Sequence, residues 1–85
     1  MTKQEYFTKI REELINYTYS NGAFMAMPDY ALEGLFTEYS ETCATYVNNR
    51  TQAKAYLNEF VQEGLLKAST NPRFNTIDYM LVNYN

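Results

Sequence analysis

The sequence predicts a single α+β domain with three helices, a short strand after the first helix, and a C-terminal antiparallel β-hairpin. Three observations predict it: helical spacing of apolar residues in three runs, capping and stop residues at the ends of these runs, and alternation of apolar residues near the C-terminus. A chain of 85 residues with 46% hydrophobic residues can build one packed core. We therefore expect one domain over residues 1–85.

The first helix is predicted to begin near residue 3. Thr2 and Glu5 have the spacing of a capping box, in which each side chain bonds the other residue's backbone amide. Asn21-Gly22 is a helix stop, because glycine tolerates the left-handed conformation that ends helices. Between these signals, apolar residues recur on one helical face: Phe7, Ile10, Leu14 and Tyr17.

A short strand and a second helix are expected next. Residues 23–28 form an apolar run between a glycine stop and a proline start, which favours a buried strand. Pro28 suits a first helical position, and Asp29 complements the helix dipole. The apolar stripe that follows predicts a helix ending between Ser40 and Ala44; its residues are Leu32, Leu35, Phe36 and Tyr39.

The third helix has the strongest end signals. Asn48 or Asn49 can cap it, and Gly64 is placed to end it. Its expected apolar face comprises Ala53, Tyr56, Leu57, Phe60 and Val61.

The C-terminal region has the signature of a β-hairpin. Residues 65–69 and 76–82 are the two strands, and residues 70–75 form the loop between them. In the second strand Ile77, Tyr79 and Leu81 alternate with Asp78, Met80 and Val82.

The order of these elements resembles the winged-helix superfamily. The likeness lies in AKAYLNEFVQEGLLKAS, which is similar to the third helix and its exit into the wing, and in YMLVN, which is similar to the returning wing strand. One departure is the connection from Glu41 to Val47, which is longer than the roughly 3 to 4 residues of a helix-turn-helix and has no glycine.

The resemblance implies that the start of the third helix meets the major groove of DNA and that the wing contacts the backbone. The candidate nucleic-acid-binding residues are Asn49, Arg50, Gln52, Lys54, Lys67 and Arg73. Specific binders usually make about 6 to 10 phosphate contacts, whereas these residues include only four cations. We therefore expect a regulator of this kind to be a homodimer, because a monomer with four useful cations would bind weakly. The pI near 4.8 also opposes approach to DNA.

Residues 28–47 form an acidic block, with four carboxylates, no basic residue and thus a net charge of −4. Charged residues on a helix usually only keep it soluble, but Glu33, Thr37 and Glu41 repeat every four residues, which brings like charges together. Exposed tyrosines beside carboxylates are typical of protein-binding surfaces. The candidate partner-binding residues are Asp29, Tyr30, Glu33, Glu38, Glu41 and Tyr46.

The nine tyrosines divide into two groups. Five have core-facing spacings, namely Tyr6, Tyr17, Tyr39, Tyr56 and Tyr79. The other four fall outside the apolar stripes and are expected at the surface: Tyr19, Tyr30, Tyr46 and Tyr84.

Catalytic and cofactor chemistry is not expected. The sequence has no histidine, no Gly-rich phosphate loop and one cysteine, Cys43, with no nearby base and an expected buried or half-buried position. We expect no enzyme activity, no cofactor and no metal site. The N-terminus lacks a signal-peptide pattern and no apolar run could span a membrane, so we expect a cytoplasmic protein without membrane partners.

Two functional hypotheses follow. The first is a small interaction protein that binds a basic, nucleic-acid-handling protein through an acidic, Tyr-bearing face. In size and character it resembles small acidic bacteriophage inhibitors of host or defence proteins, including anti-CRISPR proteins. The alternative is a winged-helix transcriptional regulator that binds duplex DNA.

Overall fold

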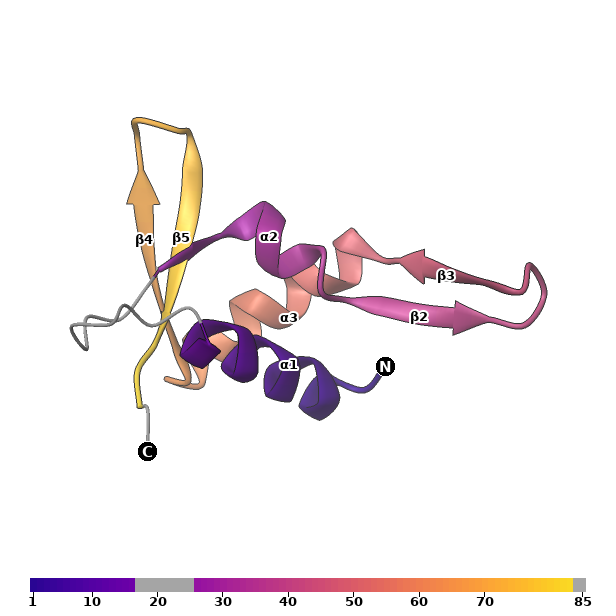
Figure 1. Cartoon of the computed structure of the whole chain (residues 1–85). Coiled ribbons are helices and arrows are strands. Elements are labelled where there is room, and N and C mark those ends of the chain that lie inside the picture. The colour runs from indigo at the N-terminus through magenta and orange to yellow at the C-terminus, as the bar shows by residue number, and fades with distance from the viewer. Residues whose placement is uncertain (17–25, 84–85) are drawn as a thin grey trace.

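The computed structural model describes residues 1–16 and 26–83 (Figure 1). It is a small α+β domain with three helices and antiparallel strands. In chain order the elements are α1 (Lys3–Asn16), β1 (Met27–Pro28), α2 (Asp29–Glu33), β2 (Thr37–Ser40), β3 (Thr45–Asn48), α3 (Arg50–Gln62), β4 (Leu66–Asn71) and β5 (Thr76–Leu81).

The strands form two separate sheets. The larger sheet has the order β1-β5-β4, and both of its pairings are antiparallel. The C-terminal hairpin predicted from the sequence is thus confirmed, with Leu66 opposite Leu81 and Asn71 opposite Thr76. The smaller sheet contains only β2 and β3, which extend away from the helices as a long hairpin (Figure 1).

Three of the predicted helix ends are confirmed, namely the start of α1 and both ends of α3. At the start of α1, the backbone amide of Thr2 donates to Glu5, and the amide of Glu5 donates to the Thr2 hydroxyl at 3.1 Å. The Asn49 side chain caps α3 by accepting from the amide of Gln52 at 3.1 Å. After α3, Gly64 has a φ of 78°, in the left-handed region that ends helices.

The core lies where α1, α2 and α3 meet β5. Tyr6 is at its centre, fully buried, with its ring edge-on to Phe36 at 4.9 Å and 6.0 Å from the ring of Phe60. The Tyr6 hydroxyl donates to the carbonyl oxygen of Leu32 at 2.6 Å, so α1 is joined to α2 by a buried hydrogen bond. The core therefore combines aromatic packing with a satisfied polar group.

The prediction of a long second helix is wrong. Helix α2 ends at Glu33, and residues 37–48, expected to be helix and loop, form the β2–β3 hairpin. The expected helical repeat of Glu33, Thr37 and Glu41 therefore does not exist. Tyr39, expected in the core, is 57% exposed.

Two smaller expectations are corrected as well. Cys43 is exposed, because it lies in the turn of the β2–β3 hairpin. In β5, Tyr79 and Leu81 are buried as expected, but Ile77, which lies nearer the turn of the hairpin, is 41% exposed. The helix stop at Asn21-Gly22, residues 23–25 of the expected strand, Tyr17, Tyr19 and Tyr84 lie outside the described residues.

The buried tyrosines predict a loss of stability at high pH. Burial raises the pKa of the Tyr6 hydroxyl, and the Glu33 carboxylate and Tyr79 raise it further. The folded state thus favours the neutral phenol. The stability that this group contributes is fully present below its unfolded pKa of about 10 and is lost as the pH rises above that value. We expect the free energy of unfolding, measured in urea, to fall by up to about 1.4 kcal/mol per pH unit for this group.

The matched variant is Tyr6→Phe. At pH 7 the free energy of unfolding of this variant should be lower than that of the wild type by about 0.5–1.5 kcal/mol, because the hydrogen bond to Leu32 is lost. Above pH 10 its stability should fall less steeply than that of the wild type. Equal slopes for the two proteins would show that Tyr6 does not titrate on unfolding.

Candidate functional site

The β2–β3 hairpin is the most prominent surface feature of the described residues (Figure 1). We define residues 37–48 as the arm; it projects from the end of α2 and the start of α3 (Figure 1). Residues 41–48 are all exposed, and the molecule is 44 Å long in its largest dimension against 27 and 24 Å in the others. Isolated two-stranded hairpins are marginally stable in water, so an arm with two solvated faces needs support from elsewhere.

One face of the arm carries a pair of tyrosines. Tyr39 and Tyr46 are directly opposite in the register, with ring centroids 5.6 Å apart in an edge-to-face arrangement. Tyr46 is 71% exposed. Since residues alternate along a strand, Val47 lies on the other face, opposite Glu38, and is itself 47% exposed. Both faces of the arm thus expose apolar surface.

The charge of the arm is entirely negative. Glu38 and Glu41 are its charged residues, and residues 37–48 contain no lysine or arginine. The Glu38 carboxylate forms an ion pair with the N-terminal amine of Met1, whereas Glu41 lies in the exposed turn. A partner that approaches the end of the arm therefore meets negative charge beside aromatic rings.

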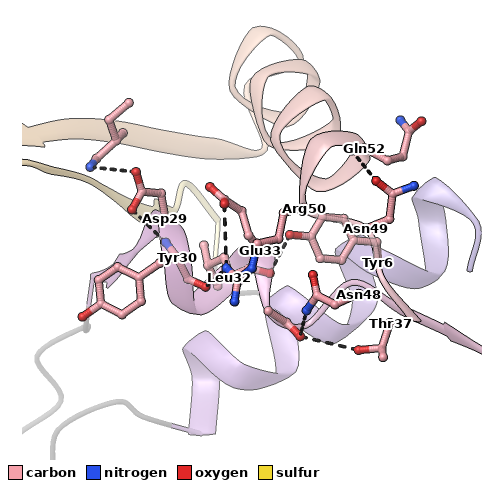
Figure 2. Close-up of polar contacts among 12 residues, drawn as sticks. Tyr6, Asp29, Tyr30, Leu32, Glu33, Thr37, Asn48, Asn49, Arg50 and Gln52 are labelled. Atoms are coloured by element: carbon pink, nitrogen blue, oxygen red, sulfur yellow. Dashed lines mark hydrogen bonds and ion pairs between the residues drawn. The ribbon is translucent and has the colours of Figure 1, made fainter. Parts of the chain in front are cut away.

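The arm is held at its base by the carbonyl groups at the end of α2 (Figure 2). The carbonyl oxygen of Gly34 accepts from the Asn48 side-chain amide at 3.1 Å and from the Thr37 hydroxyl at 3.5 Å. The backbone amide of Asn49 donates to the carbonyl of Phe36 at 3.3 Å. Both strands of the arm are thereby attached to the body of the domain.

Arg50 connects α3 to a different carbonyl group, that of Tyr30 in α2. Its guanidinium donates to the carbonyl oxygen of Tyr30 at 3.2 Å and lies 3.9 Å from the carboxylate of Glu33 (Figure 2). The side chain of Glu33 is only 7% exposed, so this pairing offsets part of the cost of burying a charge. Arg50 and Glu33 therefore connect α2 to α3.

The structure brings together only half of the predicted partner-binding residues. Glu38, Glu41 and Tyr46 lie in the arm. Asp29 instead ties α2 to β5, since its carboxylate accepts from the amides of Tyr30 at 2.7 Å and Ile77 at 3.4 Å. Glu33, as described, is buried against Arg50.

Tyr30 is exposed as expected, but it lies beside the C-terminal hairpin, in a groove shared with Phe74. The expectation of one continuous acidic helix face is therefore wrong. Of the four carboxylates predicted for it, only Glu38 and Glu41 lie in the arm.

The predicted nucleic-acid-binding residues are mostly engaged or dispersed. Asn49 is used as a helix cap and Arg50 as the link to α2. Lys54 lines a hollow together with two carboxylates, those of Asp29 and Glu33. Gln52 is half-buried, and the two cations expected at the wing, Lys67 and Arg73, are exposed on β4 and in the β4–β5 turn. The start of α3 therefore presents few free groups to DNA.

Sequence reasoning missed Tyr39 and Val47 as surface residues. A signal was present: TEYS and TYVN, the runs at 37–40 and 45–48, are rich in the aromatic and β-branched residues favoured in strands and are separated by four residues. The helical stripe ending at Tyr39 competed with this signal. The turn lacks glycine, and Ala44 adopts a φ of 49° there.

Comparisons with protein-family models, curated proteins and solved structures gave no match to this chain. Among residues 1–16 and 26–83, histidine, cysteine and carboxylate side chains form no group of three or more that could hold a metal ion. No helix in the described part of the chain is long and apolar enough to cross a membrane.

The structural role of Arg50 can be tested by Arg50→Ala. We expect the free energy of unfolding, measured in urea, to fall by about 1–2 kcal/mol, because the Tyr30 carbonyl loses a donor and the buried Glu33 loses its ion pair. Lys67→Ala, at an exposed strand position, should change it by less than about 0.5 kcal/mol. Adding Glu33→Gln to Arg50→Ala should recover part of the loss. If Arg50→Ala were as stable as Lys67→Ala, the link would contribute nothing.

Proposed function

We propose that this chain is a small non-enzymatic interaction protein that uses the arm to bind a basic, nucleic-acid-handling protein, in the manner of bacteriophage-encoded inhibitors. The observation that carries the proposal is the exposed pair Tyr39 and Tyr46 on a projecting hairpin whose charged side chains are all acidic. Neither ring contributes to the core of the domain. Adjacent apolar side chains that are left exposed on a surface often mark a site of interaction with another protein.

The chemistry of the arm favours a protein with a positively charged surface. Tyrosine rings supply contact area at a low cost in side-chain entropy, and they are enriched among residues that dominate binding energy. Glu41, in the exposed turn, adds a negative potential that attracts a basic partner and raises the association rate, whereas Glu38 is paired with the N-terminal amine of Met1. Nucleic-acid-binding proteins carry such surfaces in order to contact phosphates.

The shape of the arm favours insertion into a cleft. Tyr39 and Tyr46 occupy one face and Val47 the other, so a cleft can contact both faces at once. In a two-stranded sheet each strand also has one edge with unpaired backbone groups, which a strand of the partner can extend. The hydrogen bond from Asn48 to Gly34 and the hydrogen bond from Arg50 to Tyr30 fix the base of the arm. This support lowers the conformational entropy that the arm loses on binding.

We also propose that the domain is a winged-helix-like fold in which the arm is inserted between α2 and α3. The order α1, β1, α2, α3, β4, β5 and the sheet order β1-β5-β4 support this arrangement. DNA binding is the less favoured function for this fold. Asn49 and Arg50 already form hydrogen bonds within the protein, and the arm adjoins the start of α3, the part that would contact DNA.

The arm is tested by the double variant Tyr39→Ser/Tyr46→Ser. The wild-type protein, tagged and expressed in its native host, should co-purify with a basic protein that is identified by mass spectrometry and then purified. The double variant should bind that purified partner at least about tenfold more weakly, because aromatic anchors often contribute 2 kcal/mol or more each. Affinity is measured by calorimetry.

The matched control is Val82→Ser, which removes an apolar residue that is 56% exposed and lies after β5, outside the arm. It should bind as the wild type does. Charge reversal with Glu41→Lys should mainly slow association and reduce its dependence on salt. A purified partner that binds the tyrosine double variant with wild-type affinity would contradict the proposal.

The DNA-binding alternative gives a separate prediction. Wild-type protein at about 50 mM salt, where phosphate contacts are strongest, should not shift the fluorescence anisotropy of random-sequence duplex DNA at micromolar concentrations. Steeply salt-dependent binding that is lost in Lys54→Ala/Lys67→Ala would instead favour the regulator.

A further inference from the structure

A second surface site lies away from the arm, between α2 and the turn of the C-terminal hairpin. It is a groove of about 410 Å³, within the size range of ligand sites. Residues from three regions line it, chiefly Pro28, Tyr30, Asn71, Phe74, Thr76 and Asp78. Regions far apart in the sequence thus meet around one hollow.

The groove is bordered by two aromatic rings that the core does not use. Tyr30, on α2, is 61% exposed, and Phe74, in the β4–β5 turn, is 67% exposed. The described ring contacts of the core involve neither of them. Exposed aromatic rings at the border of one groove offer contact area to a ligand.

Asp78 is the one charged side chain among the residues that line the groove, and it is half-buried. Its two carboxylate oxygens accept one hydrogen bond each, from the Asn71 amide at 3.1 Å and the Thr76 hydroxyl at 3.1 Å. The ion pairs formed among the described residues do not include it. Neutral donors therefore fix the carboxylate in place and leave its charge uncompensated.

A fixed carboxylate beside aromatic rings is the combination that recognises an organic cation. Rings attract cations through their π-faces, and the carboxylate supplies a full opposite charge. The ring of Phe74 already has such a contact, since the guanidinium of Arg73 lies 5.3 Å from its centroid. An anionic ligand would instead be repelled by Asp78.

We infer that this groove binds an arginine or lysine side chain presented by a peptide segment of another protein. The inference goes beyond the proposed function of the arm, because the groove shares no residue with residues 37–48 and its test requires no knowledge of the partner. A basic peptide is the occupant that the charge of Asp78 and the two rings select.

The test is an NMR titration of the full chain at low salt with the peptide acetyl-Gly-Arg-Gly-amide. Signals of Tyr30, Phe74 and Asp78 should shift and saturate at millimolar peptide, and the corresponding lysine peptide should give similar shifts. The citrulline peptide, which has the same shape without the charge, should bind at least about fivefold more weakly, since the attraction depends on the cation.

Variants separate this site from the arm and from other ligands. Asp78→Asn should weaken binding of the arginine peptide by about tenfold. Tyr30→Leu, at an exposed position where the fold is not at risk, should also weaken it, whereas Tyr39→Ser/Tyr46→Ser should not. Arg73→Gln should bind at least as well as the wild type, because it removes a competing cation from the ring of Phe74.

The inference is overturned if the citrulline and arginine peptides bind equally, or if Tyr30→Leu binds the arginine peptide with wild-type affinity. It is also overturned if the groove signals respond to a single-stranded oligonucleotide and not to the peptide. Loss of that response in Arg73→Gln would assign the oligonucleotide contact to Arg73.

Discussion

The hydrogen bonds accepted by carbonyl groups of α2 and of Gly34 are the interaction on which the rest of the structure depends. The carbonyl oxygens of Tyr30 and Leu32 accept the backbone amides of Gly34 and Leu35, and each has a second lone pair for a donor from another element. Tyr6 of α1 donates to Leu32, Arg50 of α3 donates to Tyr30, and Asn48 of the arm donates to Gly34 (Figure 2). The end of α2 therefore fixes the positions of three elements at once, including the arm.

The fold also separates residues of the same type into structural and surface roles. Tyr6 and Tyr79 are buried, and burial raises the pKa of both hydroxyls, whereas Tyr39 and Tyr46 face solvent on the arm. The acidic residues divide in the same way. Glu33 is buried against Arg50, whereas Glu41 is free of such a contact among the described residues. Residue type alone therefore does not identify the interacting surface.

The parts of the fold that could be predicted from the sequence are those governed by local chemistry. The capping pair of Thr2 and Glu5, the cap at Asn49 and the stop at Gly64 each depend on residues within four positions of one another. The arm could not be predicted from periodicity, because Leu32, Leu35, Phe36 and Tyr39 fit a helical stripe equally well. The roles of Glu33 and Arg50, 17 positions apart, depend on a tertiary contact that no local pattern indicates.

The arm and the groove are built by different hairpins, yet both present carboxylate and aromatic groups together. Glu38 and Glu41 accompany Tyr39 and Tyr46 on the arm, and Asp78 accompanies Tyr30 and Phe74 at the groove. An acidic chain with pI near 4.8 can thus direct its excess negative charge to two separate places. If one basic partner contacts both, the second contact forms at a high effective concentration, so two weak sites together give strong binding without a large buried interface.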